Sequence, residues 1–203
     1  LNHKHKLYER DLKELDTKEV EKINILTGGF PCQAFSIAGY RKGFNDDRGN
    51  IFFEILRFID GLEPKIVFLE NVKNLQSHDK GRTFEIIKSE LQDRGYYLDY
   101  KVLNSSEYGN VPQNRERIYI VGFKDKKAYE NFDFPKQKKL NVKITDLLEK
   151  QADEYFYYHK SKYYPQLKEE MTNKDTVYQW RRKYVRENKS NLCPTLTANM
   201  GTG

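Results

Sequence analysis

The sequence predicts an α/β fold for the first two thirds of the chain, because strands and helices alternate along it. Short apolar runs that are typical of buried strands occur at residues 23–26, 65–69 and 118–123. Between them, apolar residues recur at helical spacing over residues 52–59 and 84–91. This alternation is typical of a doubly wound sheet, and we expect about half of one here.

Residue types that end helices follow each expected helix. Gly61 and Pro64 follow the first helix, and Gly95 follows the second. Residues 96–103 alternate well enough to form a further strand. Residues 34–50 form a long glycine-containing stretch, which we interpret as a functional loop, since loops of this length are uncommon in compact domains.

The charge of the chain is unevenly distributed. The net charge is +6, and residues 136–203 hold 14 Lys and Arg against 8 Asp and Glu, so the whole excess lies there. Tyrosines mix with lysines in the same part of the chain, and we place a domain boundary near residue 140. A neutral first part and a basic last part suggest a chemical domain joined to a segment that meets a polyanion. A lysine-rich solvated surface is the alternative interpretation.

Composition excludes several classes of protein. No apolar run approaches 18 residues and no charged-then-apolar leader is present, so we expect neither a membrane span nor a signal peptide. The two cysteines, Cys32 and Cys193, support no disulfide framework and suit a reducing cytosol. No His/Cys cluster has zinc spacing, and no metal is expected.

A stiff corner follows the first predicted strand. Two glycines allow the backbone to turn sharply or to approach another group closely. Pro31 then fixes its own φ and favours an extended Phe30, so that Cys32 is presented just past the strand. The Cys32 thiol is a candidate nucleophile, although an unpaired cysteine is also a common small core residue.

A carboxylate and two arginines accompany this corner. Ligands of open α/β sheets bind outside the carboxyl ends of strands, where Cys32 and Glu70 are both expected. Arg115 and Arg117 are two residues apart at the start of a strand and so share a face. They could clamp a phosphate or a polar base edge, and stabilise a Cys32 thiolate. A helix-capping or ion-paired Glu70 and a solvated arginine pair are the alternatives.

Three motifs make the chain recognisable. Residues 29–36 (GFPCQAFS), 70–72 (ENV) and 113–117 (QNRER) resemble, in order and spacing, three central motifs of the bacterial DNA cytosine-5 methyltransferases. The resemblance runs from about residue 11 to residue 135, and residues 193–197 (CPTLT) resemble the later part of the family's target-recognition domain. It implies a partial Rossmann-like S-adenosylmethionine-dependent methyltransferase sheet over residues 1–139. The start of a small, irregular, β-rich target-recognition domain would follow over residues 140–203.

The resemblance also implies roles for individual residues. Cys32 would add to C6 of a flipped-out cytosine while Glu70 holds N3 and the exocyclic amine. Arg117 would contact the base near O2, and Arg115 would position the thiol and a backbone phosphate. The remaining expected contacts are Asp11 and Pro31 to the cofactor S-adenosylmethionine, and Gln33, Ser36, Arg48 and Thr195 to DNA.

The resemblance indicates the modification enzyme of a restriction-modification system, a monomer acting on double-stranded DNA in the bacterial cytoplasm at the nucleoid. It would be paired functionally with a restriction endonuclease. A related tRNA cytosine-5 methyltransferase and a non-catalytic DNA-binding relative remain alternatives. The family's glycine-rich first motif and its last motifs are expected before Leu1 and after Gly203. We therefore expect residues 1–203 alone to bind S-adenosylmethionine poorly and not to turn over, an expectation that normal methyl transfer by this fragment would contradict.

Overall fold

The computed structural model describes residues 6–31, 51–181, 183–188 and 190–196, which form two compact units. The first unit runs to Val102 and resumes over Arg117–Phe134. The second comprises Leu103–Glu116 and the chain from Pro135 onward. The chain therefore enters the second unit twice. The division at residue 140, which concerns domains of the whole protein, stays a prediction.

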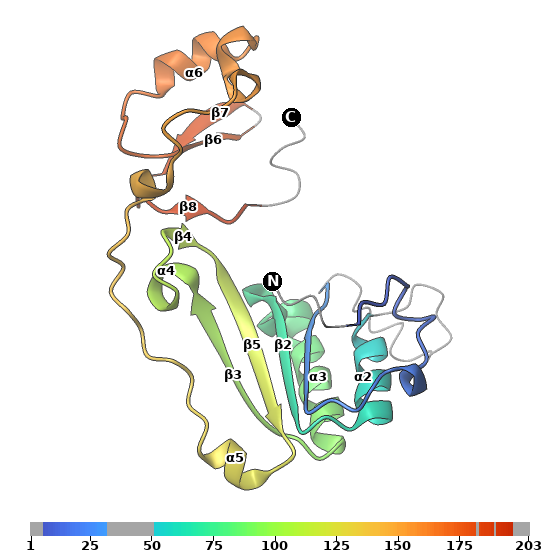
Figure 1. The fold of residues 1–203 in the computed structure, drawn as a ribbon. Helices are drawn as coiled ribbons and strands as arrows, with labels where there is room; N and C mark the ends of the chain where they lie inside the picture. The colour runs from blue at the N-terminus through green and yellow to red at the C-terminus, as the bar shows by residue number, and fades with distance from the viewer. Residues whose placement is uncertain (1–5, 32–50, 182, 189, 197–203) are drawn as a thin grey trace. The chain divides into compact units, whose positions relative to one another are not determined.

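A four-stranded sheet with the strand order β1-β2-β5-β3 is the framework of the first unit (Figure 1). Its strands are β1 (Ile25–Gly29), β2 (Ile66–Val72), β3 (Tyr97–Asn104) and β5 (Glu116–Phe123). β1 and β2 run parallel, whereas β5 runs antiparallel to β2. The α/β class is confirmed, but the sheet is mixed and not purely parallel. The antiparallel direction of β5 places its first residues beside the last residues of β2.

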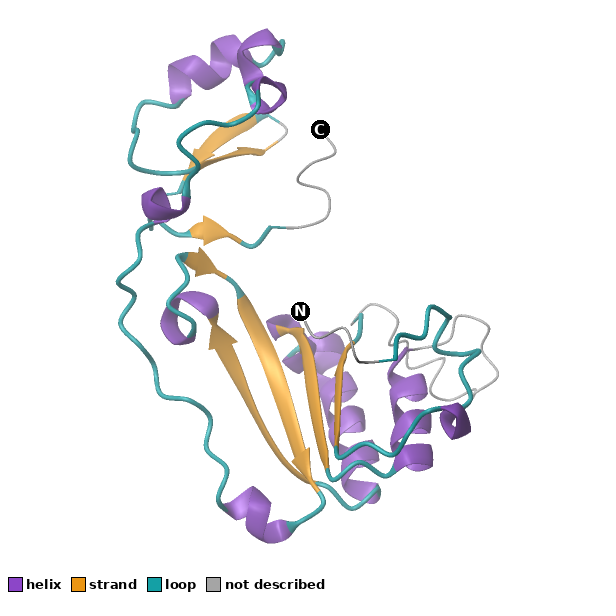
Figure 2. Ribbon diagram, in the orientation of Figure 1, coloured by secondary structure: helices purple, strands orange, loops and turns teal. Residues whose placement is uncertain are grey.

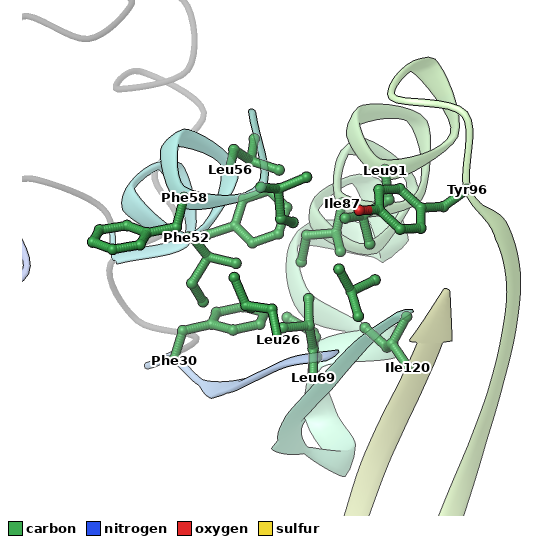
Figure 3. Packing of buried hydrophobic residues seen from close by; sticks show 14 of the residues in the cluster. Leu26, Phe30, Phe52, Leu56, Phe58, Leu69, Ile87, Leu91, Tyr96 and Ile120 are labelled. Atoms are coloured by element: carbon green, nitrogen blue, oxygen red, sulfur yellow. The ribbon is translucent and has the colours of Figure 1, made fainter. Parts of the chain in front are cut away.

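Two helices, α2 (Ile51–Leu62) and α3 (Arg82–Asp93), cover one face of this sheet (Figures 1 and 2). Their apolar residues recur every three or four positions and so form one apolar stripe on each helix. Figure 3 shows these stripes packed on the inward-facing side chains of the strands. Residues of the resulting core include Leu26, Phe52, Leu56, Leu69, Ile87, Leu91 and Ile120.

Two predicted boundaries are wrong, and close packing explains both. The first strand spans Ile25–Gly29, not residues 23–26, so its glycines lie within the strand and make no turn. A Cβ on Gly28 would lie 3.3 Å from Ile55 Cδ1, so glycine here permits the close approach of α2. Gly61 lies inside α2 and does not end it, and a Cβ there would lie only 2.5 Å from Thr17 Oγ1.

The second unit combines short strands with short helices. β4 (Gln113–Asn114) pairs in parallel with β8 (Cys193–Pro194), and β6 (Tyr178–Arg181) forms an antiparallel hairpin with β7 (Tyr184–Glu187). Its helices are α4 (Ser105–Tyr108) and α6 (Tyr164–Glu170), with single 3-10 turns at Ile144–Leu147, Glu154–Phe156 and Tyr158–Lys160. In the first unit, α5 (Lys126–Glu130) follows β5, and 3-10 turns occupy Thr17–Glu19, Lys73–Gln76 and His78–Gly81. Within the described ranges, no helix is both long and apolar enough to cross a bilayer.

Candidate active site

Three strands bring polar groups to one edge of the first unit's sheet. β1 and β2 end at this edge, and the antiparallel β5 begins there. In the strand register, Gly29 lies opposite Glu70, and Val72 lies opposite Arg117. A Cβ on Gly29 would lie 3.5 Å from Glu70 Oε2, so β1 passes directly beside the carboxylate. The expected position of Glu70 beside the end of the first strand is therefore met, although Glu70 lies within β2 and not beyond it.

The Glu70 carboxylate forms an ion pair with Arg117. Arg117 Nε lies 2.9 Å from Glu70 Oε1, and the Arg117 and Glu70 side chains are 15% and 34% exposed, respectively. Both residues belong to the set that faces away from the buried Val67, Leu69, Ile118 and Ile120, because side chains alternate along a strand. The pair is charge-assisted and half-buried, which fixes the direction of the carboxylate more firmly than a solvated contact would. Glu70 thus presents an oriented acceptor at the open edge.

Asn71 ties the end of β1 to β2. Its Nδ2 donates to the Phe30 carbonyl at 2.8 Å, and its Oδ1 accepts from the Val72 amide at 2.8 Å. The Asn71 side chain is only 3% exposed, and the Phe30 ring packs on Phe52 with a centroid separation of 5.3 Å. The backbone that leads into Pro31 and Cys32 is therefore held by a buried hydrogen bond and an aromatic contact.

The other predicted site residues of the first unit differ in how far the structure describes them. Cys32, Gln33, Ser36 and Arg48 lie outside the described residues. Pro31 is exposed and lies two residues after the end of β1. Asp11 is exposed, and its Oδ1 accepts from the Lys13 amide at 2.9 Å.

Arg115 belongs to the second unit, where Asn104 organises its backbone. The Arg115 amide donates to Asn104 Oδ1 at 3.2 Å, and the Arg115 carbonyl accepts from the Ser105 amide at 3.1 Å. Asn104 Nδ2 also donates to Asn114 Oδ1 at 2.7 Å. Asn104 therefore shapes the segment between β4 and β5, and its position as the N-cap of α4 is the sequence signal that could have revealed it.

Thr195 also lies in the second unit. Its hydroxyl donates to the Asn114 carbonyl at 2.9 Å, next to the β4–β8 pairing of Gln113 with Cys193. Burial raises the pKa of the Cys193 thiol, which favours its neutral form. Residues 113–114 and 193–195, which belong to two motifs about 80 residues apart in sequence, are thus brought together by strand pairing and by the Thr195 hydrogen bond.

The fold and this edge define a class of α/β protein. Its carboxylate, Glu70, is oriented by the Arg117 guanidinium and lies beside the end of β1. Comparison with known proteins identifies the family. A family model described as C-5 cytosine-specific DNA methylase matches residues 1–202. The chain therefore belongs to the C-5 cytosine-specific DNA methylase family.

Its similarity to individual relatives is extensive. The Type II methyltransferase M.Bsp6I of Bacillus sp. is 53% identical over 207 residues, covering all of this chain and 66% of the relative. The Type II methyltransferase M.HhaI of Haemophilus parahaemolyticus is 47% identical over 140 residues, covering 69% of this chain and 42% of the relative. The chain thus spans two thirds or less of the length of these relatives.

Solved structures confirm the methyltransferase fold. A DNMT2 variant from Spodoptera frugiperda superposes with a TM-score of 0.57 at 21% identity, covering 75% of this chain and 48% of that chain. The Dnmt2 methyltransferase of S. pombe gives a TM-score of 0.52 at 23% identity, covering 71% and 46% respectively. The Rossmann-like sheet that the resemblance implied is therefore confirmed.

Proposed function

We propose that the full-length protein is a sequence-specific DNA methyltransferase that transfers a methyl group from S-adenosylmethionine to C5 of cytosine. The observation that carries this proposal is the edge where Glu70, oriented by Arg117, lies beside the β1 segment that leads into Cys32. Family membership and the names of the relatives support DNA as the substrate. The basic residues after position 135 suit a polyanionic partner.

The proposed chemistry begins at Cys32. The target cytosine must leave the base stack, because neither face of C5 and C6 is accessible inside the duplex. The Cys32 thiolate forms a bond to C6, and the electrons of the C5–C6 double bond move toward C5 and the ring nitrogen. C5 then takes the methyl group of S-adenosylmethionine: the bond between sulfur and the methyl carbon breaks, and the donor leaves as a neutral thioether. Return of the N3 proton to Glu70, transfer of the C5 proton to solvent and departure of the thiolate restore the aromatic ring and the free enzyme.

The other site residues serve this step. Glu70 accepts from the exocyclic amine of the cytosine through one oxygen and delivers a proton to N3 through the other, which neutralises the negative charge that develops there after attack. Arg117 keeps the carboxylate in place through the 2.9 Å contact and meets the base near O2. Arg115 positions the thiol and a backbone phosphate. Gln33, Ser36, Arg48 and Thr195 contact the DNA.

Asp11 and Pro31 are the proposed contacts to S-adenosylmethionine, which supplies an activated methyl group when bound. Asp11 is suited to such a contact because it is exposed. The hydrogen bond described for its carboxylate, from the Lys13 amide, uses Oδ1. An exposed carboxylate oxygen is a good acceptor for an exocyclic amine such as that of adenine. No group of three or more His, Cys, Asp or Glu side chains that could hold a metal occurs within the described part of the chain.

A duplex that contains 5-fluorocytosine tests the mechanism, because fluorine at C5 blocks the final loss of a proton and traps the covalent adduct. Full-length protein with S-adenosylmethionine should give a denaturation-resistant complex with this duplex. The Cys32→Ala variant should give none. Absence of the adduct with intact Cys32 would refute the nucleophile. Parallel reactions with duplex DNA and tRNA distinguish the related tRNA enzyme, and DNA binding without any adduct would indicate a non-catalytic relative.

The names of the relatives as Type II methyltransferases support a role in restriction-modification. We propose that the protein acts as a monomer on double-stranded DNA in the bacterial cytoplasm, at the nucleoid, and that it protects that DNA from a companion restriction endonuclease. In cells that also lack the companion endonuclease, deleting the gene should leave these sites unmethylated, which bisulfite sequencing of the genomic DNA would reveal.

A further inference from the structure

The β6–β7 hairpin of the second unit has two chemically different faces. Its register pairs Gln179 with Arg186 and Trp180 with Val185. Since side chains alternate along a strand, Trp180 and Val185 lie on one face, and Gln179 and Arg186 lie on the other. The chain thus builds a two-stranded ribbon with an apolar side and a polar side.

The hairpin lies beside α6 (Figure 1), and its apolar side contacts Tyr163, the residue before that helix. The Trp180 and Tyr163 rings lie 5.0 Å apart between centroids. The Val185 amide donates to Glu170 Oε2 at 3.1 Å. These contacts hold the hairpin within the second unit. Because Trp180 points toward Tyr163, the polar side of the hairpin faces away from Tyr163.

The polar side, which we call the ribbon face, consists of Gln179, Arg181, Tyr184 and Arg186. Arg181, Tyr184 and Arg186 are exposed. A hollow of about 320 Å³ lies against this face, and Gln179 and both arginines line it together with Asn114 and Thr195. None of the described residues that line the hollow is acidic; the remaining ones are Tyr178, Asn188 and Pro194. The hollow therefore offers two guanidinium groups with no carboxylate among them.

We infer that the ribbon face reads guanine in the major groove and that Arg181 and Arg186 are specificity-determining residues. This inference rests on the proposed function. A two-stranded β-ribbon fits the major groove, where guanine presents its O6 and N7 acceptors and arginine can donate to both at once. Arg186 and Gln179 are directly opposite in the ribbon, so their Cβ atoms lie about 5 Å apart and both side chains can reach the same short stretch of the groove.

The composition of the face favours base edges over backbone phosphates. A phosphate only accepts hydrogen bonds, so a phosphate site needs donors alone. The Gln179 amide and the Tyr184 hydroxyl each carry an acceptor as well as a donor, which matches the mixed edge of a base pair. Thr195 and Asn114 also line the hollow, and Asn114 immediately precedes Arg115, for which a phosphate contact is proposed. Base reading and backbone positioning would then meet in one hollow.

The test uses the full-length protein. Bisulfite sequencing of DNA methylated in cells first defines the recognition site of the wild type. Methyl transfer is then measured on duplexes in which each guanine of that site is replaced in turn by 7-deazaguanine, which lacks the N7 acceptor. The proteins compared are the wild type, Arg181→Ala, Arg186→Ala and the charge-conserving Arg186→Lys, with Lys174→Ala as the control for loss of an exposed positive charge outside the hollow.

We expect one 7-deazaguanine position to lower kcat/KM of the wild type about ten-fold or more. The kcat/KM of Arg186→Ala should be lowered by a similar factor on the natural duplex. Replacing the same guanine by 7-deazaguanine should then lower it little further, and the variant should accept other bases at that position. Arg186→Lys should keep binding to random DNA but lose this discrimination. The Lys174→Ala variant should keep the site preference of the wild type.

Two results overturn the inference. If both alanine variants weaken binding equally on all sequences, with a lower salt dependence, the arginines contact phosphates and not bases. If both variants retain the sequence preference of the wild type, neither arginine contributes to base recognition. In either case the wild type still forms the 5-fluorocytosine adduct, so the proposed function stands. Absence of that adduct in the wild type would refute the proposed function, and this inference with it.

Discussion

The Asn71 side-chain amide donates to the Phe30 carbonyl at 2.8 Å, which joins the end of β1 to β2 through a buried hydrogen bond. The residue before Asn71 is Glu70, and the residue after Phe30 is Pro31. One hydrogen bond therefore fixes the backbone of the proposed nucleophile segment relative to the carboxylate that would hold its target. We therefore expect Asn71 to act as a positioning residue and not as a catalytic one.

The Asn71→Ala variant tests this role. Loss of the donor leaves the buried Phe30 carbonyl and Val72 amide without their partner, which should cost about 1–3 kcal/mol of unfolding free energy. Adduct formation with 5-fluorocytosine DNA should slow, because the Cys32 segment loses its fixed position, while the affinity for DNA stays close to that of the wild type. The exposed Asn74→Ala is the matched control. Equal adduct rates for the two variants would remove Asn71 from the positioning of Cys32.

Glu70→Gln keeps the shape of the side chain but removes its charge. Without the negative charge, the Arg117 contact weakens and the cytosine ring loses its oriented acceptor. We expect methyl transfer to fall by about 10²–10⁴-fold, the range for a catalytic acid or base, with DNA binding retained. Glu85→Gln is the control, because Glu85 is 70% exposed and pairs with Lys88. A Glu70→Gln enzyme of wild-type rate would exclude a role for this carboxylate.

Gly122 lies opposite Val67 in the β2–β5 pair, on the covered face of the sheet. A Cβ there would lie 2.6 Å from Val67 Cγ2 and 2.9 Å from Leu98 Cδ2. Gly122→Ala should therefore destabilise the protein by about 1–3 kcal/mol through overpacking. Chemical denaturation measures this loss. The double variant with Val67→Ala should recover part of it, and strictly additive losses would contradict the packing argument.

Tyr96 gives an alkaline limit to stability. Its hydroxyl donates to the Pro64 carbonyl at 2.6 Å, and burial, followed by the Asp60 and Glu63 charges, raises the pKa of Tyr96 to about 12. The unfolded tyrosine titrates near pH 10, so the contribution of the neutral hydroxyl is complete below that pH and is lost as the pH rises toward 12. Tyr96→Phe should lose about 1 kcal/mol at pH 8. The gap between wild type and variant, measured by denaturation, should narrow between pH 10 and 12, and a constant gap would contradict the linkage.

The elements of the first unit could be predicted because their signals are local. The apolar stripe of α2 and the apolar run of β2 are visible in short windows, and Glu70 follows that run directly. A close approach was one of the two predicted roles of Gly28, but its partner Ile55 could not be predicted, and neither could the contact of Gly61 with Thr17, since both partners come from elsewhere in the chain. The pairing of Gln113 with Cys193 is non-local in the same sense.

The β6–β7 hairpin, in contrast, left a signal that sequence reasoning missed. Tyr178 and Trp180 alternate with polar residues, as Val185 does between Tyr184 and Arg186, but each strand is only four residues long. Short windows with exposed positions on both faces give weak periodicity. The prediction of a small, irregular, β-rich domain after residue 140 therefore included strands but did not locate this hairpin.

The site edge of the first unit takes Gly29, Glu70 and Arg117 from strands that are about 40 residues apart in sequence, so no local fragment contains it. A molecule that binds this edge binds the sheet with its strands paired and not the open state in which they have separated. Its binding therefore raises the free energy needed to separate the strands. Amide protons at the opposite end of β2 and β5, near Ile66 and Phe123, should then exchange more slowly with deuterium when DNA is bound, provided that their exchange requires the strands to separate. Slower exchange of amide protons that do not contact the ligand would thus report that the edge is occupied.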